Sequence, residues 1–210
     1  MIIKTCVVGV MSTNCYLLIN ENTKEAVVID PGAQSSLIIS KITDLNLKPV
    51  AILLTHGHFD HIMAAEDLAE TYNIKIYASE EETELLSDCS LNCSNLIRTN
   101  FTLEADILLV NGEIISLAGF DIEVIGTPGH TNGGVSYYIE DEGVVFTGDT
   151  LFFESIGRTD FPTGDIRSLS NSIVKHLFTL PEEVIAYPGH GDVTSIKHEK
   201  TNNLFMLEYR

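Results

Sequence analysis

The sequence predicts an α/β fold in which two β-sheets pack face to face and helices cover their outer faces. Strand-like and helix-like segments alternate along the first half of the chain, and further strands and helices fill the rest. Elements that each bury one apolar face are stable when they stack in layers. The 210 residues hold no linker, low-complexity tract or charge block, so we expect one domain over residues 1–210.

In the first half, runs rich in β-branched residues between turn residues predict strands, and apolar residues at helical spacing predict helices. The predicted strands are Ile2–Val8, Cys15–Ile19, Ala26–Ile29, Val50–Leu54 and Ile74–Tyr77. The predicted helices are Leu37–Leu45, Asp60–Tyr72 and Glu80–Leu86. Residues 88–105 sustain no period, which predicts a loop or short helices over one side of a site.

Strand signals return in the second half. The predicted strands are Ile107–Val110, Glu113–Ser116, Asp121–Ile125, Val135–Ile139, Val144–Phe146 and Val184–Ala186. The predicted helices are Ile166–Phe178 and Glu199–Leu207. Asn111-Gly112 predicts a tight hairpin between the first two of these strands, because Asn-Gly favours the turn that joins antiparallel neighbours.

The charge balance excludes some classes of partner. Thirty acidic residues against twelve basic ones give a net charge of −18, which argues against nucleic acid and anionic membranes. No apolar stretch reaches the ~20 residues of a membrane span, and no signal peptide is recognisable at the start. The four cysteines form no Cys-x-x-Cys pair, so a reducing cytoplasm is the expected location.

Five histidines and two aspartates form a pattern typical of a two-metal site. Four of them lie in Thr55-His56-Gly57-His58-Phe59-Asp60-His61, directly after a predicted strand, and the other three each follow a strand-like run beside Gly or Pro. Imidazole and carboxylate are the ligands of hydrolytic zinc and of non-haem iron. The seven candidate ligands are His56, His58, Asp60, His61, His130, Asp149 and His190.

Spacing divides these residues into two groups. His56 and His58 point the same way in an extended segment, so both reach one metal, which His130 completes. The remaining assignments concern the second metal and the bridge. Asp60 and His61 begin the next helix and face the second metal, and His190 completes the ligands of that metal. Asp149 has two carboxylate oxygens, so it can bridge the two metals.

The predicted chemistry is hydrolysis by a metal-bound hydroxide. Two divalent ions that share a water lower its pKa toward about 7, and they also stabilise the oxyanion that forms. We expect Asp60 to be the catalytic residue that orients the hydroxide and relays its proton. The sequence has no Gly-x-Ser-x-Gly motif for a serine nucleophile.

The order of these motifs resembles that of the metallo-β-lactamase superfamily. The resemblance runs from Thr13-Asn14-Cys15-Tyr16 through Asp30-Pro31-Gly32 to Tyr187-Pro188-Gly189-His190, nearly the whole chain. It implies an αββα sandwich of two mixed sheets, the metallo-β-lactamase fold, with metals at one edge between the sheets.

Within the superfamily, Ile156-Gly157-Arg158-Thr159-Asp160-Phe161-Pro162 is similar to a segment of small glyoxalase II-like (hydroxyacylglutathione hydrolase-like) enzymes. This likeness implies cleavage of an acyl-thiol such as S-lactoylglutathione, with two zinc ions per chain and iron or manganese as alternatives. The chain departs from that family because little follows His190, where longer enzymes hold glutathione, and because Asn202-Asn203 stands where Asn-Pro is common. The thiol carrier is therefore open.

Several alternatives remain at this level. A mononuclear iron persulfide dioxygenase would use His56, His130 and Asp149, and a lactone hydrolase would use the same attack on an acyl carbon. A binding module without turnover is a third class. Arg158 either binds an anionic part of the substrate or forms an ion pair with Asp160. We expect the substrate to be a small molecule and the protein to be a monomer or a small homo-oligomer.

Overall fold

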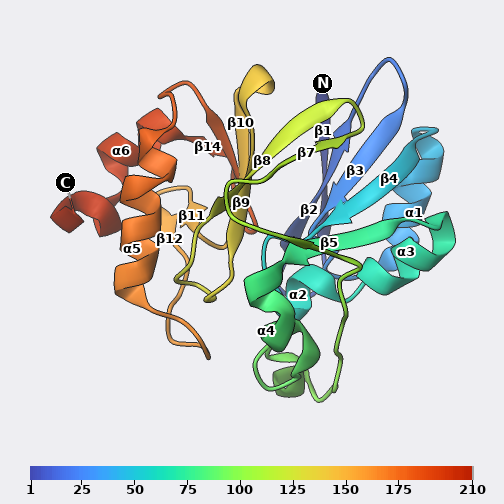
Figure 1. The fold of residues 1–210 in the computed structure, drawn as a ribbon, viewed down its shortest axis with the longest axis horizontal. Helices are drawn as coiled ribbons and strands as arrows, with labels where there is room; N and C mark the ends of the chain where they lie inside the picture. The colour runs from blue at the N-terminus through green and yellow to red at the C-terminus, as the bar shows by residue number, and fades with distance from the viewer. Residues whose placement is uncertain (210) are drawn as a thin grey trace.

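The computed structural model describes the backbone of residues 1–209 and the side chains of residues 1–206. Two six-stranded sheets face each other, and helices cover both outer faces (Figure 1). This arrangement confirms the predicted αββα sandwich of two mixed sheets.

The first sheet contains the N-terminal strands in sequence order. Its first three strands are antiparallel and the next three continue in parallel, so the sheet is mixed. The strands, in spatial order, are β1 (Ile2–Val8), β2 (Thr13–Ile19), β3 (Glu25–Ile29), β4 (Lys48–Leu53), β5 (Lys75–Ser79) and β6 (Ile107–Leu109).

The second sheet contains most of the C-terminal strands. In spatial order they are β14 (Thr194–Ser195), β13 (Ile185–Pro188), β10 (Val144–Gly148), β9 (Val135–Ile139), β8 (Phe120–Gly126) and β7 (Ile114–Leu117). The pair of β10 and β13 is parallel, and the other pairs are antiparallel. A separate ribbon pairs β11 (Leu151–Phe152) with β12 (Ser155–Ile156).

Three apolar layers hold the sandwich together. Leu18 of β2 and Phe146 of β10 pack in the layer between the sheets, whereas Leu17 points to the opposite face because strand side chains alternate. Leu17 packs toward Ile38 of a covering helix, and Val145 of β10 packs in the third layer, under the helices of the second sheet. The helices are α1 (Ser35–Asp44) and α3 (Ala65–Tyr72) over the first sheet, and α5 (Ile166–Lys175) and α6 (Ile196–Asn202) over the second (Figure 1).

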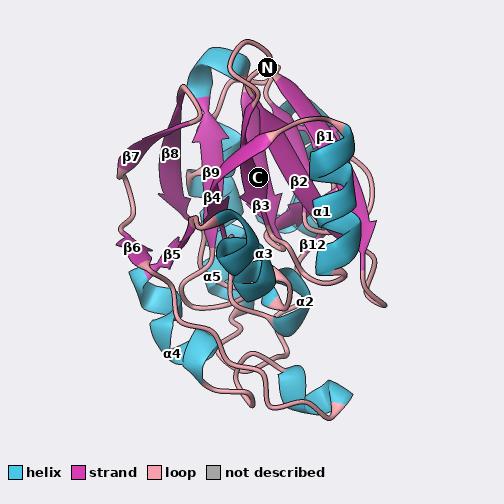
Figure 2. Cartoon of the chain, turned by 90° about the vertical axis from the view of Figure 1, so that its right-hand side faces the viewer, coloured by secondary structure: helices cyan, strands magenta, loops and turns pink. Residues whose placement is uncertain are grey.

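At one edge the two sheets are joined by backbone hydrogen bonds. Asn14 N–H of β2 donates to Gly189 O at 2.8 Å, and Val135 N–H of β9 donates to Thr55 O, also at 2.8 Å. The loop after β4, the helix α2 (Phe59–Ile62) and the helix α4 (Thr83–Ser87) lie at this edge (Figure 2). The bonds fix the loops of one sheet relative to those of the other.

The predicted Asn111-Gly112 hairpin is wrong. A turn does form, since Glu113 N–H donates to Val110 O at 3.1 Å and Gly112 has φ +83°. However, β6 before the turn pairs with β5 in the first sheet, and β7 after it pairs with β8 in the second. The turn therefore carries the chain between the sheets, because burying Leu109 in the layer between them outweighs pairing of the two strands that flank the turn.

The predicted helix Asp60–Tyr72 is two helices, α2 and α3. The chain breaks at Ala64, whose N–H donates to Pro31 O at 2.9 Å instead of continuing the helical ladder. The predicted helix Glu199–Leu207 is also divided, into α6 and a 3₁₀ turn over Leu204–Tyr209. Among the residues described, no helix is long and apolar enough to cross a membrane.

Candidate metal centre

The seven candidate ligands converge at the edge where the sheets are joined. Four come from the loop and helix after β4, and three follow β8, β10 and β13, which run in the same direction and so end at the same edge. Gly189 keeps this centre open, since a Cβ there would overlap Asp149 Oδ1 and would lie 2.7 Å from His61 Cε1. The structure thus brings together the residues that the sequence analysis selected, and their binding of metal stays a prediction.

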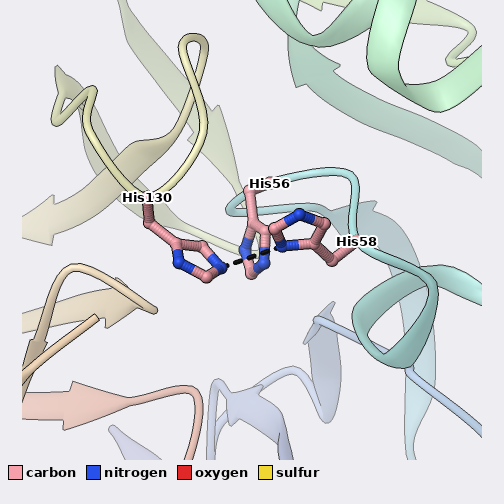
Figure 3. Close-up of side chains that lie close together, drawn as sticks. All are labelled: His56, His58 and His130. Carbon is pink, nitrogen blue, oxygen red and sulfur yellow. Dashed lines mark hydrogen bonds between the residues drawn. The ribbon is translucent and has the colours of Figure 1, made fainter. Parts of the chain in front are cut away.

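One group consists of three buried histidines. His56, His58 and His130 each offer a ring nitrogen, and these atoms lie within 4.8 Å of one another. Figure 3 shows the three rings turned toward one another, with His58 Nδ1 2.8 Å from His130 Nε2. These are the residues assigned to the first metal by their spacing.

The second group combines a carboxylate with two histidines. Ligand atoms of Asp60, His61 and His190 again lie within 4.8 Å of one another. His190 Nε2 is 3.3 Å from His61 Nε2 and 3.3 Å from Asp60 Oδ2. These are the residues assigned to the second metal.

Asp149 lies between the two groups. Its Oδ2 is 3.5 Å from His130 Nε2 and also 3.5 Å from His190 Nε2, while its Oδ1 is 3.4 Å from His61 Nε2. The Oδ1 atom is buried without a hydrogen-bond partner, and so is His56 Nε2. Leaving such a group unpaired costs about 1–3 kcal/mol, which a bound cation would remove. The donor set therefore suits a divalent metal ion.

Two of the histidines, His130 and His190, are oriented by hydrogen bonds from the ring nitrogen that points away from the centre. Nδ1 of His130 lies 2.7 Å from the carbonyl oxygen of Arg158, and Nδ1 of His190 lies 3.1 Å from that of Met11. Carbonyl oxygens only accept, so both Nδ1 atoms carry a proton, and both Nε2 atoms face the centre. Metal-binding histidines are usually oriented in this way, by a hydrogen bond from the ring nitrogen that does not touch the metal.

Asp30 is a functional residue that the sequence suggested only as part of a turn. It is buried, it accepts from the N–H of Thr55 at 2.7 Å and from its hydroxyl at 2.6 Å, and its Oδ2 lies 3.0 Å from His61 Nδ1. Thr55 Oγ1 in turn lies 3.1 Å from His56 Nδ1. One carboxylate thus orients a histidine of each group.

Glu82 is a second residue that sequence reasoning missed. Its side chain is buried and accepts from Gly57 N–H at 2.7 Å and from Gly133 N–H at 2.9 Å. It therefore joins the loop between His56 and His58 to the loop after His130. Burial raises the pKa of Glu82 to about 7. Nothing in the sequence distinguishes it from Glu80 and Glu81.

Charge at the centre favours cation binding. Burial lowers the pKa of His58 to about 3, so this ring is neutral and ready to bind a metal. Burial would raise the pKa of Asp149, but His61 and other neighbouring histidines outweigh it and hold that pKa well below its usual range. Burial opposes charge on His190, yet Asp149 and Asp60 raise its pKa to about 10. The carboxylates thus hold positive charge here even without a metal.

A cleft of about 510 Å³ opens onto the centre. Asp60, Asp149 and His190 lie at its base, and Leu96 and Ile97 form part of its wall. The segment 88–105 contains turns and a short 3₁₀ helix over Ser94–Ile97. It covers one side of the site, as the sequence predicts.

Arg158 both lines the cleft and forms the predicted ion pair. Its Nε and Nη2 donate to the two oxygens of Asp160, each at 2.7 Å, and its guanidinium lies 3.8 Å from the ring centroid of Phe161. Its role in substrate binding stays a prediction. His198 lies away from the cleft lining, 3.0 Å from Glu154 Oε1 and stacked on Phe153.

Comparison with curated proteins gives related metallo-hydrolases over nearly the whole chain. A "Probable metallo-hydrolase YqgX" of Bacillus subtilis is 39% identical over 201 residues, which cover 95% of this chain and 94% of that protein. A "Hydroxyacylglutathione hydrolase GloC" of Haemophilus influenzae is 37% identical over 196 residues, which cover 92% of each chain.

Solved structures share the fold. A B3 metallo-β-lactamase, BLEG-1, has a TM-score of 0.94 at 41% identity and covers 98% of this chain and 100% of its own. A di-iron-bound protein, TTHA1623, has a TM-score of 0.86 at 32% identity, covering 96% and 99%. ETHE1 from Myxococcus xanthus has a TM-score of 0.82 at 32% identity, covering 97% and 84%.

The family model of the metallo-β-lactamase superfamily matches residues 8–190, a span that includes all seven candidate ligands. The chain therefore belongs to the metallo-β-lactamase superfamily.

Proposed function

We propose that this protein is a binuclear metal-dependent hydrolase that cleaves an acyl-thiol ester. The observation that carries the proposal is the position of Asp149 between two groups of three ligands, with its carboxylate within 3.5 Å of histidines from both. Metal sites that share one bridging carboxylate suit hydrolysis at an acyl carbon. The Haemophilus influenzae relative, named a hydroxyacylglutathione hydrolase, supports a thioester substrate.

The proposed ligand sets follow the two groups. His56, His58 and His130 would hold one ion, and Asp60, His61 and His190 the other, with Asp149 shared. When bound, the two ions would supply a water whose pKa falls toward about 7 and a positive charge for the oxyanion. We propose zinc at both sites. The di-iron-bound relative makes iron the main alternative.

Asp60 is the proposed catalytic residue. It faces the cleft, and its Oδ2 accepts from the hydroxyl of Thr13 at 3.1 Å. Burial would raise its pKa, but His61 and His190 outweigh burial and hold the pKa of Asp60 below its usual value. The carboxylate is therefore ionised at neutral pH and can orient the attacking water and accept its proton. Transfer of that proton to the sulfur would release the thiol.

The test combines metal analysis with product analysis. Protein purified without a histidine tag should contain about two metal ions per chain and should release free thiol and carboxylic acid from a thioester. A parallel assay with a chromogenic cephalosporin examines β-lactam hydrolysis, which the BLEG-1 structure makes relevant. A protein that holds two metals but releases no thiol from any thioester would contradict the proposal.

A persulfide dioxygenase is the second candidate. It would use one iron on His56, His130 and Asp149. His130 Nε2 lies 3.5 Å from Asp149 Oδ2, and the similarity to the di-iron-bound TTHA1623 favours iron at this centre. This function requires about one iron per chain and consumption of oxygen with a persulfide substrate. Measuring oxygen uptake beside thiol release separates the two candidates.

A further inference from the structure

We infer that the cleft selects acyl-thiols whose thiol arm is uncharged and apolar, and disfavours arms that carry free carboxylates, such as glutathione. The inference rests on the proposed thioester hydrolysis and adds the chemical class of the substrate. In that reaction water oxygen bonds to the acyl carbon, the carbon–sulfur bond breaks, and the sulfur leaves as a thiol with a proton. The part of the substrate that distinguishes one thioester from another therefore lies in the cleft outside the centre.

The first observation is the apolar wall of the cleft. At the rim, Met11, Leu96 and Ile97 are exposed by 52%, 64% and 43%. Phe152 and Ile156 line the cleft from the ribbon after Asp149. Large apolar side chains that stay exposed around a pocket are favourable contacts for an apolar ligand, since covering them removes them from water.

The second observation is the charge of the same wall. Among the residues described, Arg158 is the one Lys or Arg side chain that lines the cleft. Two of its nitrogens already donate to both oxygens of Asp160, and one face lies against Phe161. Its charge is therefore neutralised by a carboxylate of its own loop. Arg98 follows Ile97 but lies outside the cleft lining.

The two observations act in the same direction. A carboxylate on the thiol arm would leave water for an apolar surface with no unpaired cation to receive it, which is unfavourable. The net charge of −18 adds long-range repulsion of anions. An uncharged arm escapes both effects and covers the apolar rim.

A matched pair of substrates tests the inference. The N-acetylated form of S-lactoylglutathione and its diethyl ester share the scissile bond and differ in whether the two carboxylates of the thiol arm are free. Acetylation removes the ammonium charge, so the diester is uncharged. We expect kcat/KM for the diester to exceed that for the free acid by at least about tenfold, with the ratio falling as salt screens the repulsion. A free acid that is hydrolysed as well as or better than the diester overturns the inference and leaves the hydrolase proposal standing. No thiol release from either substrate overturns both.

Two variants locate the selectivity in the wall. Asp160→Asn frees Arg158 from its carboxylate, and Leu96→Lys adds a cation at the rim, so each should raise kcat/KM for the free acid relative to the diester by several-fold. Ile114→Lys is the matched control, since Ile114 is exposed by 66%, close to the 64% of Leu96, but lies on β7 outside the cleft lining. An equal change of the ratio in the control would assign the effect to net charge and overturn a role for the wall.

Discussion

Asp30 Oδ2 lies 3.0 Å from His61 Nδ1, and both side chains are almost completely buried. Asp30 directly follows β3, whereas His61 lies in α2, the helix after β4. Asp30 has φ +50°, a left-handed conformation that non-glycine residues rarely adopt. The backbone is therefore held in an unfavourable region that directs this carboxylate under the proposed metal site.

Asp30→Asn should weaken metal binding. The amide carries no charge to support the Nδ1 proton of His61, and it cannot accept from both groups of Thr55 and from His61 as the carboxylate does. Loss of such an outer partner typically weakens metal affinity by about 10–100-fold. Competition with a zinc chelator measures the metal affinity of the variant relative to that of the wild type. Asp67→Asn is the control, since Asp67 pairs with Ser35 on the exposed surface, and equal loss in both variants would contradict the role of Asp30.

Asp60→Asn should remove most turnover and leave the fold intact. Asparagine keeps the shape but accepts no proton, so we expect kcat to fall by at least about 10²-fold. Circular dichroism shows whether the fold is kept. Metal content measured on the same sample shows whether the second ion is kept, since Asp60 is also a proposed ligand of that ion. Wild-type-like turnover would exclude the role given to Asp60.

The candidate ligands could be identified from the sequence because each motif is local. His56, His58 and His61 occur within six residues of the sequence, and the turns with His130, Asp149 and His190 carry their own Gly or Pro. Strand order then brings these turns to one edge. The layered fold was predictable for the same reason, since it depends on short-range patterns repeated along the chain.

The supporting residues were not predictable, because their role exists only through distant contacts. Glu82 reaches Gly57 across 25 residues and Gly133 across 51 residues, and no pattern around it differs from that of an exposed acidic turn. The hairpin error at Asn111-Gly112 has the same origin. The local turn forms as predicted, but burial of β6 and β7 in different sheets decides which strands pair.

Removal of metal should abolish hydrolysis reversibly. A strong chelator takes away the cations that the unpaired Asp149 Oδ1 and His56 Nε2 are placed to bind, so thiol release should stop and return on addition of zinc. The assay is turnover before chelation, after dialysis and after titration with zinc. Activity that survives complete metal removal, verified by elemental analysis, would exclude the mechanism.

Glu82→Gln should change how stability depends on pH. Burial raises the pKa of Glu82 from 4.5 to about 7, so its contribution to stability is fully present below pH 4.5 and is lost as the pH rises through 7. The shift corresponds to roughly 3 kcal/mol at most. Glutamine does not titrate, so the free energy of unfolding of wild type minus that of the variant should fall between pH 4.5 and 7 and then level off.

Urea unfolding of metal-free protein at a series of pH values measures this difference, because the histidines of the centre contribute equally to both proteins and cancel. Glu81→Gln corrects for the loss of one negative charge from the same turn, since its side chain is exposed. A difference that rises with pH would contradict the raised pKa and would mean that the N–H groups of Gly57 and Gly133 hold Glu82 ionised. In both outcomes the change of this difference with pH shows whether Glu82, which joins the two ligand loops, is protonated or ionised in the folded protein. The rest of the site is the same in the wild type and the variant.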